Sequence, residues 1–194
     1  MTISFSAGET KLSLRGGFIE TAGPEMFTLN MLQGSRSGLN DPHSILISQS
    51  AAKTLFGGDD PMGKLLKIDN SDRMDVKVTG VYEDLPYNSQ FYKLNFFMPW
   101  ELQVSNNPWM KEQGWENHFL FIYAEIVPNT SIQAVNENIR EAELKVIRNI
   151  PSLEHEVTFN PVVMLHPMSD WHLYSNFKDG VLANGPIESV RIIA

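Results

Sequence analysis

The 194-residue sequence contains no cysteine, which excludes disulfide scaffolds, thiol nucleophiles, iron–sulfur clusters and zinc sites built on thiolates. It also lacks an excess of positive charge. Its 15 basic and 23 acidic residues give a net charge of −8, so we expect no binding to nucleic acid or to an anionic membrane surface. No stretch of the sequence approaches the roughly 18 apolar residues of a membrane span. The first residues lack the basic and apolar segments of a signal peptide, so we expect a cytoplasmic protein or a piece of a longer chain that carries its own targeting.

The composition is that of a folded domain. Apolar residues make up 42% of the chain and charged residues 20%, which is enough apolar material for a core. The 13 glycines and 11 prolines are an ordinary share, so collagen-like and low-complexity chains are excluded. The length predicts one domain or two small lobes.

The first half of the chain predicts mostly strands and one clear helix. We expect paired strands near residues 12–18, interrupted by a bulge or turn at Gly16 and Gly17, then a short helical or irregular element from Pro24 to Gly34. A strand at 44–47 leads into a helix that Ser48 caps and that Gly57 and Gly58 end after Phe56. The following segments are a hairpin of strands 64–68 and 74–82 around the polar turn 69–72, and a strand at 92–98 that ends at Pro99.

The second half predicts a loop, two strands and a long helix. Residues 100–115 have turn signals and three tryptophans, so we expect a loop-rich excursion. Residues 119–124 are apolar on both faces of an extended chain, which favours a central strand. The amphipathic pattern of 132–146 indicates a helix with a capping box at Thr130–Gln133, and a last strand is expected from Val157 towards Leu165. The whole pattern predicts an α+β fold with two main helices.

Two groups of residues are candidates for chemistry or binding. His166, Asp170 and His172 would make a metal-dependent hydrolase site if their side chains converged, although a structural role in a turn is more typical of this spacing. Trp100, Trp109 and Trp115 suggest either a platform that stacks on a sugar or peptide, or a hydrophobic cluster under a long loop. We predict no catalytic residue, no cofactor and no metal ligand.

Three segments, in order, resemble the MacB-like periplasmic core domain of FtsX-type ABC transporter permeases, in the variant common in Bacteroidetes-like bacteria. The first is DPHSILISQSAAKTLFG at 41–57, followed by DPMGK at 60–64. The second is VTGVYEDLPYNS at 78–89, and the third is LHPMSDWHLYS at 165–175. The resemblance covers about residues 20–194. The motif positions that it identifies as structural are Asp41, Pro42, Ser48, Phe56, Gly57, Pro61, Gly63, Lys64, Gly80, Asp84, Pro86, Asn88, Ser89, Pro167, Asp170 and His172.

The resemblance implies a two-lobed periplasmic domain with mixed sheets, whose N-terminal elements are shortened or absent here. Residues 1–194 would be excised from between the first and second membrane helices of a permease, with an inserted strand–helix lobe at about 35–85 and the remainder forming a membrane-proximal α/β lobe. The membrane would be reached only through the flanking helices. The resemblance therefore implies that this domain lies on the periplasmic side of the inner (cell) membrane.

The function implied by the resemblance is mechanical. A cytoplasmic ATPase subunit or domain would drive a dimeric permease, and this domain would transmit the movement to a periplasmic substrate or partner that is exported or signalled to. Trp100, Trp109 and Trp115 are then possible contact residues. The alternative is a free-standing periplasmic sugar- or peptide-binding module, which would show saturable tryptophan quenching by a small ligand.

Overall fold

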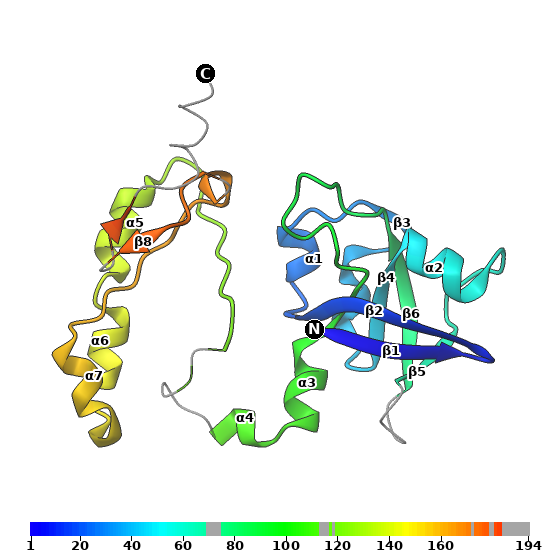
Figure 1. The fold of residues 1–194 in the computed structure, drawn as a ribbon, viewed down its shortest axis with the longest axis horizontal. Coiled ribbons are helices and arrows are strands. Elements are labelled where there is room, and N and C mark those ends of the chain that lie inside the picture. The colour runs from blue at the N-terminus through cyan, green and yellow to red at the C-terminus, as the bar shows by residue number, and fades with distance from the viewer. Residues whose placement is uncertain (69–74, 113–116, 118, 172, 179–180, 184–194) are drawn as a thin grey trace. The chain divides into compact units, whose positions relative to one another are not determined.

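The computed structural model describes residues 1–68, 75–112, 117, 119–171, 173–178 and 181–183 (Figure 1). The chain divides into two compact units, which are Met1–Glu112 (unit 1) and Gln113–Ala194 (unit 2). Each unit has a hydrophobic cluster of its own. Strands dominate unit 1 and short helices dominate unit 2, so the expected α+β class is confirmed.

Six strands of unit 1 form a closed sheet. They are β1 (Thr2–Ala7), β2 (Thr10–Ile19), β4 (Ser44–Ser48), β5 (Leu65–Ile68), β6 (Asp75–Tyr82) and β7 (Phe96–Pro99). Each strand pairs with the next in the order β6-β4-β7-β2-β1-β5, and β5 pairs back with β6 to close the ring. The β4–β6 and β2–β7 pairings are parallel and the others are antiparallel, so the expected mixed sheet is confirmed. Strand β3 (Met31–Gly34) adds to β6 beside this ring.

The period-two pattern of these strands separates two apolar clusters. Val76 and Val78 of β6 are fully buried in the larger cluster while Asp75 and Lys77 are exposed, which confirms the predicted hairpin; its turn, 69–72, lies outside the described residues. The larger cluster also takes side chains from the other strands of the ring, among them Phe5, Leu14, Ile45, Ile47, Leu66, Phe96 and Met98. The smaller cluster takes Leu46, Tyr82 and Phe97 from β4, β6 and β7, together with Leu29 and Leu39 from the segment between β2 and β4.

Helix α2 (Gln49–Phe56) forms as the sequence predicts. The Ser48 side chain accepts a hydrogen bond from the backbone N–H of Ala51 at 3.3 Å, and Gly57 ends the helix with φ +62°. Ala51, Ala52 and Leu55 place the apolar side of the helix in the larger cluster. The other helical segments of unit 1 are α1 (Gly23–Met26), the 3₁₀ turn η1 (Arg36–Asn40), α3 (Trp100–Asn106) and α4 (Trp109–Glu112).

Four predictions for unit 1 differ from the structure. The bulge or turn expected at Gly16 and Gly17 is absent, because β2 continues through both glycines and pairs there with β7. The element expected to run from Pro24 to Gly34 is split into α1 and strand β3, because residues 31–34 pair with β6. The strand expected at 92–98 is shorter and forms only at β7, since turns occupy residues 88–93. The excursion at 100–115 is helical where it is described: α3 and α4 occupy it, and Asn107 and Pro108 separate them.

Unit 2 is built from short helices around a small core. Its elements are α5 (Ile132–Ile139), α6 (Ala142–Ile147), the 3₁₀ turn η2 (Pro151–Leu153), α7 (Glu154–Thr158), the 3₁₀ turn η3 (Met168–Asp170), β8 (Phe177–Lys178) and β9 (Val181–Leu182). Leu144, Ile147 and Leu153 are its buried apolar cluster, with Ile150 and Val157 packed against it.

The long helix predicted at 132–146 is broken into α5 and α6. The carbonyl of Arg140 accepts a hydrogen bond from the N–H of Val163 at 3.0 Å, and Glu141 leaves helical geometry at φ −100° and ψ 13°. The cap is also one residue later than predicted, because the side chain of Ser131, rather than that of Thr130, accepts from Ala134 N–H at 3.1 Å.

The two strands predicted in unit 2 are absent from the residues described there. Residues 119–124 are in no strand, and Phe121 and Ile122 have exposed fractions of 88% and 84%. Val157 lies in helix α7, where it packs on the Leu144 cluster, so the strand expected from Val157 to Leu165 does not start there. In both places the apolar pattern is present, but no described strand pairs with it.

None of the helices in the described part of the chain has the length and hydropathy of a membrane span. Residues 35–85 contribute β4, β5 and β6 to the same closed sheet as β1, β2 and β7, and they lie within unit 1. The lobe boundaries expected at 35 and 85 stay a prediction for the complete protein.

Candidate functional site

Motif residues from two distant segments meet at the N-terminus of α2. The carboxylate of Asp84 accepts hydrogen bonds from the backbone N–H of Ser50 at 3.1 Å and from its hydroxyl at 2.9 Å. The hydroxyl of Ser48 accepts from Ala51 N–H and from the Asn95 side chain, at 3.3 and 3.4 Å. A carboxylate at this end of a helix satisfies free N–H groups and complements the helix dipole, so this cluster holds α2 to the strands.

The motif at the other end of α2 joins the helix to β5. The ammonium of Lys64 lies 2.9 Å from the Asp59 carboxylate and 5.2 Å from the centre of the Phe56 ring. Its hydrogen bond and its charge both lower the pKa of Asp59. Gly63 adopts φ +74°, which favours glycine, and donates its N–H to the carbonyl of Val78 at 2.8 Å.

Turn formation and close packing account for other motif residues. The carbonyl of Pro61 accepts from Lys64 N–H at 3.1 Å, and that of Pro86 accepts from Ser89 N–H at 2.9 Å. The side chain of Asp41 accepts from the N–H of His43 at 2.9 Å. A Cβ at Gly80 would lie 2.7 Å from the Met31 side chain and 2.8 Å from that of Leu46, so β6 has no room for a larger residue there.

Pro42 is half-buried beside the Asp41 turn, and Asn88 is exposed in the turn that Pro86 begins. These two positions make no hydrogen bond that assigns them a role.

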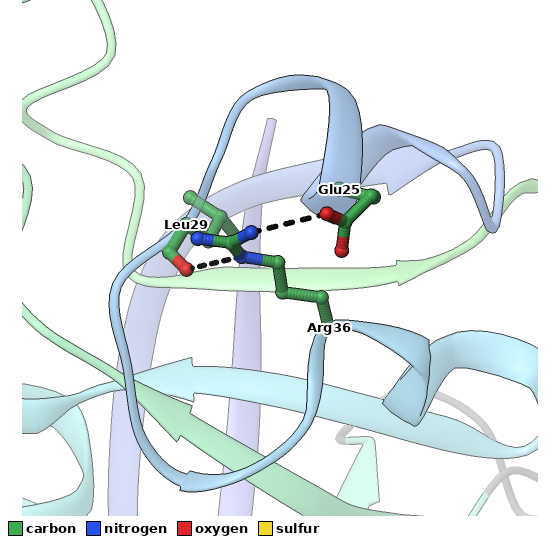
Figure 2. Close-up of polar contacts among 3 residues, drawn as sticks. All are labelled: Glu25, Leu29 and Arg36. Atoms are coloured by element: carbon green, nitrogen blue, oxygen red, sulfur yellow. Dashed lines mark hydrogen bonds and ion pairs between the residues drawn. The ribbon is translucent and has the colours of Figure 1, made fainter.

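An arginine that sequence analysis did not single out ties α1 to η1 (Figure 2). The Nε of Arg36 donates to the carbonyl of Leu29 at 2.8 Å, and its Nη1 lies 3.1 Å from the Glu25 carboxylate. The two charged side chains are 34% and 72% exposed, so the ion pair itself contributes at most about 1 kcal/mol. No spacing rule predicts a contact between a helix and a 3₁₀ turn eleven residues apart, which is why the sequence gives no signal for it.

The third motif forms a turn in unit 2. The carbonyl of Pro167 accepts from Asp170 N–H at 3.0 Å, and the Asp170 carbonyl accepts from the N–H groups of Leu173 and Tyr174 at 3.1 and 2.7 Å. The Asp170 carboxylate accepts from the Ser169 hydroxyl at 3.0 Å. These bonds are the structural role that the sequence offered as one of two alternatives.

The described residues give no support to a metal site at His166, Asp170 and His172. The Nε2 atom of His166 is buried, has no hydrogen-bond partner among the described residues, and its ring stands edge-on to Phe177 with centres 5.2 Å apart. His172 lies outside the described residues. Within the described ranges no three His, Asp or Glu side chains gather as metal ligands would.

The two tryptophans of this region that the structure describes are the first residues of helices. Trp100 is the first residue of α3 and is half-buried, whereas Trp109 is the first residue of α4 and is 46% exposed. Trp115 lies outside the described residues.

The comparisons with known proteins define the class of domain. The sequence profile of the MacB-like periplasmic core domain matches residues 2–142, which is well over half of the chain. No curated protein matches the sequence. The chain belongs to the MacB-like periplasmic core domain family, so the resemblance to this family is confirmed. The first two motifs lie inside the matched range, whereas the third, at 165–175, lies beyond it and stays a prediction.

Two crystal structures share the fold. One is a domain of a protein described as a permease from Porphyromonas gingivalis, with 23% identity and a TM-score of 0.54 over 80% of this chain and 68% of that one. The other is the periplasmic region of MacB from Actinobacillus actinomycetemcomitans, with 14% identity and a TM-score of 0.52 over 75% of this chain and 63% of that one. The chain therefore spans about two thirds of the length of each.

Proposed function

We propose that this chain is the extracytoplasmic domain of an ABC transporter permease and that it acts mechanically. It lies between the first and second membrane helices of a dimeric permease. ATP hydrolysis in a cytoplasmic ATPase subunit or domain moves those helices, and the domain passes the movement to a periplasmic substrate or partner. Family membership supports the location, and the architecture of unit 1 supports the mechanism.

The observation that carries the proposal is the closure of the six-strand sheet. Every strand of the ring has a hydrogen-bonded neighbour on both sides, because β5 pairs with both β1 and β6. Phe5 and Phe96 meet edge-on inside it, with ring centres 5.0 Å apart and no exposed surface on either side chain. A closed, tightly packed sheet cannot slide strand against strand without losing hydrogen bonds, so it transmits a displacement instead of absorbing it.

The motif residues support a mechanical role in a second way. Ser48, Asp84, Lys64 and Gly63 fix the two ends of α2 on the ring through the bonds described above. Ser48 and Asp84 act in helix capping, Lys64 in an ion pair and Gly63 through its backbone N–H in a turn, so each of these four motif residues has a structural role.

Trp109 is the residue of the tryptophan region that we propose as a partner or substrate contact, because nearly half of its side chain is exposed. We expect Trp109→Ala to leave the fold intact and to weaken transport by whole cells. Tyr87→Ala is the control for the loss of an exposed aromatic side chain of unit 1 outside the tryptophan region, and it should leave transport unchanged. Unchanged transport in the Trp109→Ala strain would remove this contact from the proposal.

The location is tested by thiol labelling of the complete permease in intact cells. These 194 residues contain no cysteine, so a single introduced thiol reports its own position once any cysteine in the rest of the permease has been replaced. Lys53→Cys, exposed on α2, should react with a membrane-impermeant maleimide, whereas Ala51→Cys, 2% exposed on the same helix, should not. If Lys53→Cys reacts only after the membrane is permeabilised, the domain is cytoplasmic and the proposal is wrong.

A further inference from the structure

The helices of unit 2 leave apolar surface uncovered. The buried cluster of this unit takes residues from α6 and η2, and α5 has no buried residue. The apolar side of α5 carries Ile132, Val135 and Ile139, all of them only half-buried. An amphipathic helix is stabilised by burying such a stripe. The described residues of unit 2 cover the apolar side of α5 only in part.

An extended segment, residues 161–165, runs along the side of α5. The side chain of Asn136 pairs with the backbone of Leu165: its Oδ1 accepts from the Leu165 N–H at 2.7 Å, and its Nδ2 donates to the Leu165 carbonyl at 3.2 Å. Val163 and Leu165 are half-buried, while Val162 and Met164 are 38% and 41% exposed. One face of this segment therefore contacts α5, and its other face is apolar and exposed to solvent.

A second extended segment, residues 119–126, has apolar side chains on both faces. Leu120, Phe121 and Ile122 are consecutive and are 53%, 88% and 84% exposed. Successive side chains of an extended chain point to opposite faces, so both faces present bare apolar surface. Tyr123 anchors the segment to unit 2: its ring centre lies 6.0 Å from that of Trp171, and partial burial raises its pKa.

We propose that residues 119–126 become an inner strand of a sheet that is completed by an extended segment of the same permease polypeptide outside these 194 residues. This inference rests on the proposed function, because it requires a longer permease chain. A strand that is apolar on both faces belongs inside a sheet covered on both sides. The α5–α6 helices, with their incomplete cover, supply one covering layer.

The length of the similar structures favours this occupant. The part of each that this chain does not match is 32% and 37%, from the covered shares of 68% and 63%, whereas 20% and 25% of this chain is unmatched, so both of those domains are longer than this chain. A second copy of the chain is a weaker occupant because each copy carries a net charge of −8, which opposes close association. A segment of the same polypeptide is also held near its site at a high effective concentration.

Hydrogen exchange followed by mass spectrometry tests the proposal. It compares the 194-residue chain with the complete permease in nanodiscs, both without nucleotide. The backbone amides of 120–122 should exchange at least about 100-fold more slowly in the permease, since strand pairing protects amides from exchange. Amides of helix α2 are the internal control and should exchange alike in both proteins.

Two outcomes would overturn the proposal. One is equally fast exchange of 120–122 in the complete permease, which means that no strand covers the segment. The other is protection in the 194-residue chain that increases with protein concentration, which identifies a second copy as the occupant. Because nucleotide and transport are not involved, protection can be found even if the domain proves to have no mechanical role, and the two proposals fail separately.

Substitutions give an independent readout. In the complete permease, Phe121→Glu and Ile122→Glu should each reduce the yield of folded protein several-fold, because each places a charge on one buried face of the strand. Tyr87→Glu, at a side chain that is 91% exposed in unit 1, should not. Normal yields of both variants would show that the two faces stay open to solvent and would refute the inner strand.

Discussion

A methyl group added at Gly16 should destabilise the closed sheet, whereas one added at the next residue should not. Gly16 is aligned with Phe96 in the parallel β2–β7 pairing. An ideal Cβ at Gly16 would lie 2.5 Å from the Cδ1 atom of the Phe96 ring and closer still to the Phe96 carbonyl oxygen. The ring is fully buried and the carbonyl belongs to the backbone, so neither can move aside cheaply. At Gly17 a Cβ would meet nothing within 4 Å.

The expected effects have opposite signs. Overpacking a core costs typically about 1–3 kcal/mol, and a clash with backbone belongs at the upper end, so we expect Gly16→Ala to destabilise unit 1 by about 3 kcal/mol. Gly17→Ala removes a flexible residue from a strand and should stabilise the unit by about 0.5 kcal/mol. For a unit of this size the first change lowers Tm by about 10–20 °C and the second raises it by a few degrees.

Thermal and urea unfolding followed by circular dichroism measure both variants against the parent chain. The two alanines differ by one position in one strand, so their helix and strand propensities cancel in the comparison. If Gly16→Ala unfolds within about 2 °C of Gly17→Ala, strand β2 is not packed against β7 and the ring is not closed at this pairing.

The remaining predictions concern single contacts of unit 1. Ser48→Ala removes the acceptor for Ala51 N–H and should destabilise the unit by about 1–2 kcal/mol in urea unfolding; an unchanged midpoint would mean that Ser48 does not cap α2. Burial first, and the charge of Asp84 second, raise the pKa of Tyr82 well above its usual value of 10. The unfolded chain therefore loses this proton first, and stability should fall as the pH rises above about 10. Tyr82→Phe should fall less steeply, and identical pH profiles of the two proteins would contradict the burial of this hydroxyl. Lys64→Met should return the lowered pKa of Asp59 towards its ordinary value in a carboxyl NMR titration, whereas Lys53→Met should leave it lowered.

Elements whose formation depends on residues close together in the chain could be predicted from the sequence. Helix α2 has a serine cap, an apolar side and a terminating glycine within ten residues, and the β5–β6 pair has a period of two around a polar turn. The closure of the ring could not be predicted, because it depends on the parallel pairings of β2 with β7 and β4 with β6, which join residues far apart in the chain.

The errors have identifiable causes. Asn106, Asn107 and Pro108 are turn residues, but here they end α3: the side chains of Asn106 and Asn107 donate to the carbonyls of Leu102 and Gln103 at 2.8 and 2.9 Å. The apolar run at 119–124 predicts a strand only where a partner strand is available, and the described residues of unit 2 provide none.

Some features of the candidate site could also be predicted from the sequence, and others could not. The motifs identified the family, and Gly57 could be assigned as the end of the helix from the sequence alone. The contact between Ser50 and Asp84 crosses 34 positions and depends on the order of β4 and β6, so it required the structure. The contacts of Arg36 with Leu29 and Glu25 have no sequence signal at all.

We expect unit 1 to move as one rigid body when the ATPase on the cytoplasmic side of the membrane hydrolyses ATP. Spin labels at Lys53→Cys on α2 and Glu101→Cys on α3, two exposed positions, measure a distance within unit 1. A label at Lys53→Cys paired with one in a membrane helix of the complete permease measures the movement of the unit. We predict that trapping the ATPase with ATP and vanadate changes the second distance and leaves the first within about 2 Å of its nucleotide-free value, since packed interiors deform little. A change in the first distance, or no change in the second, would contradict the account.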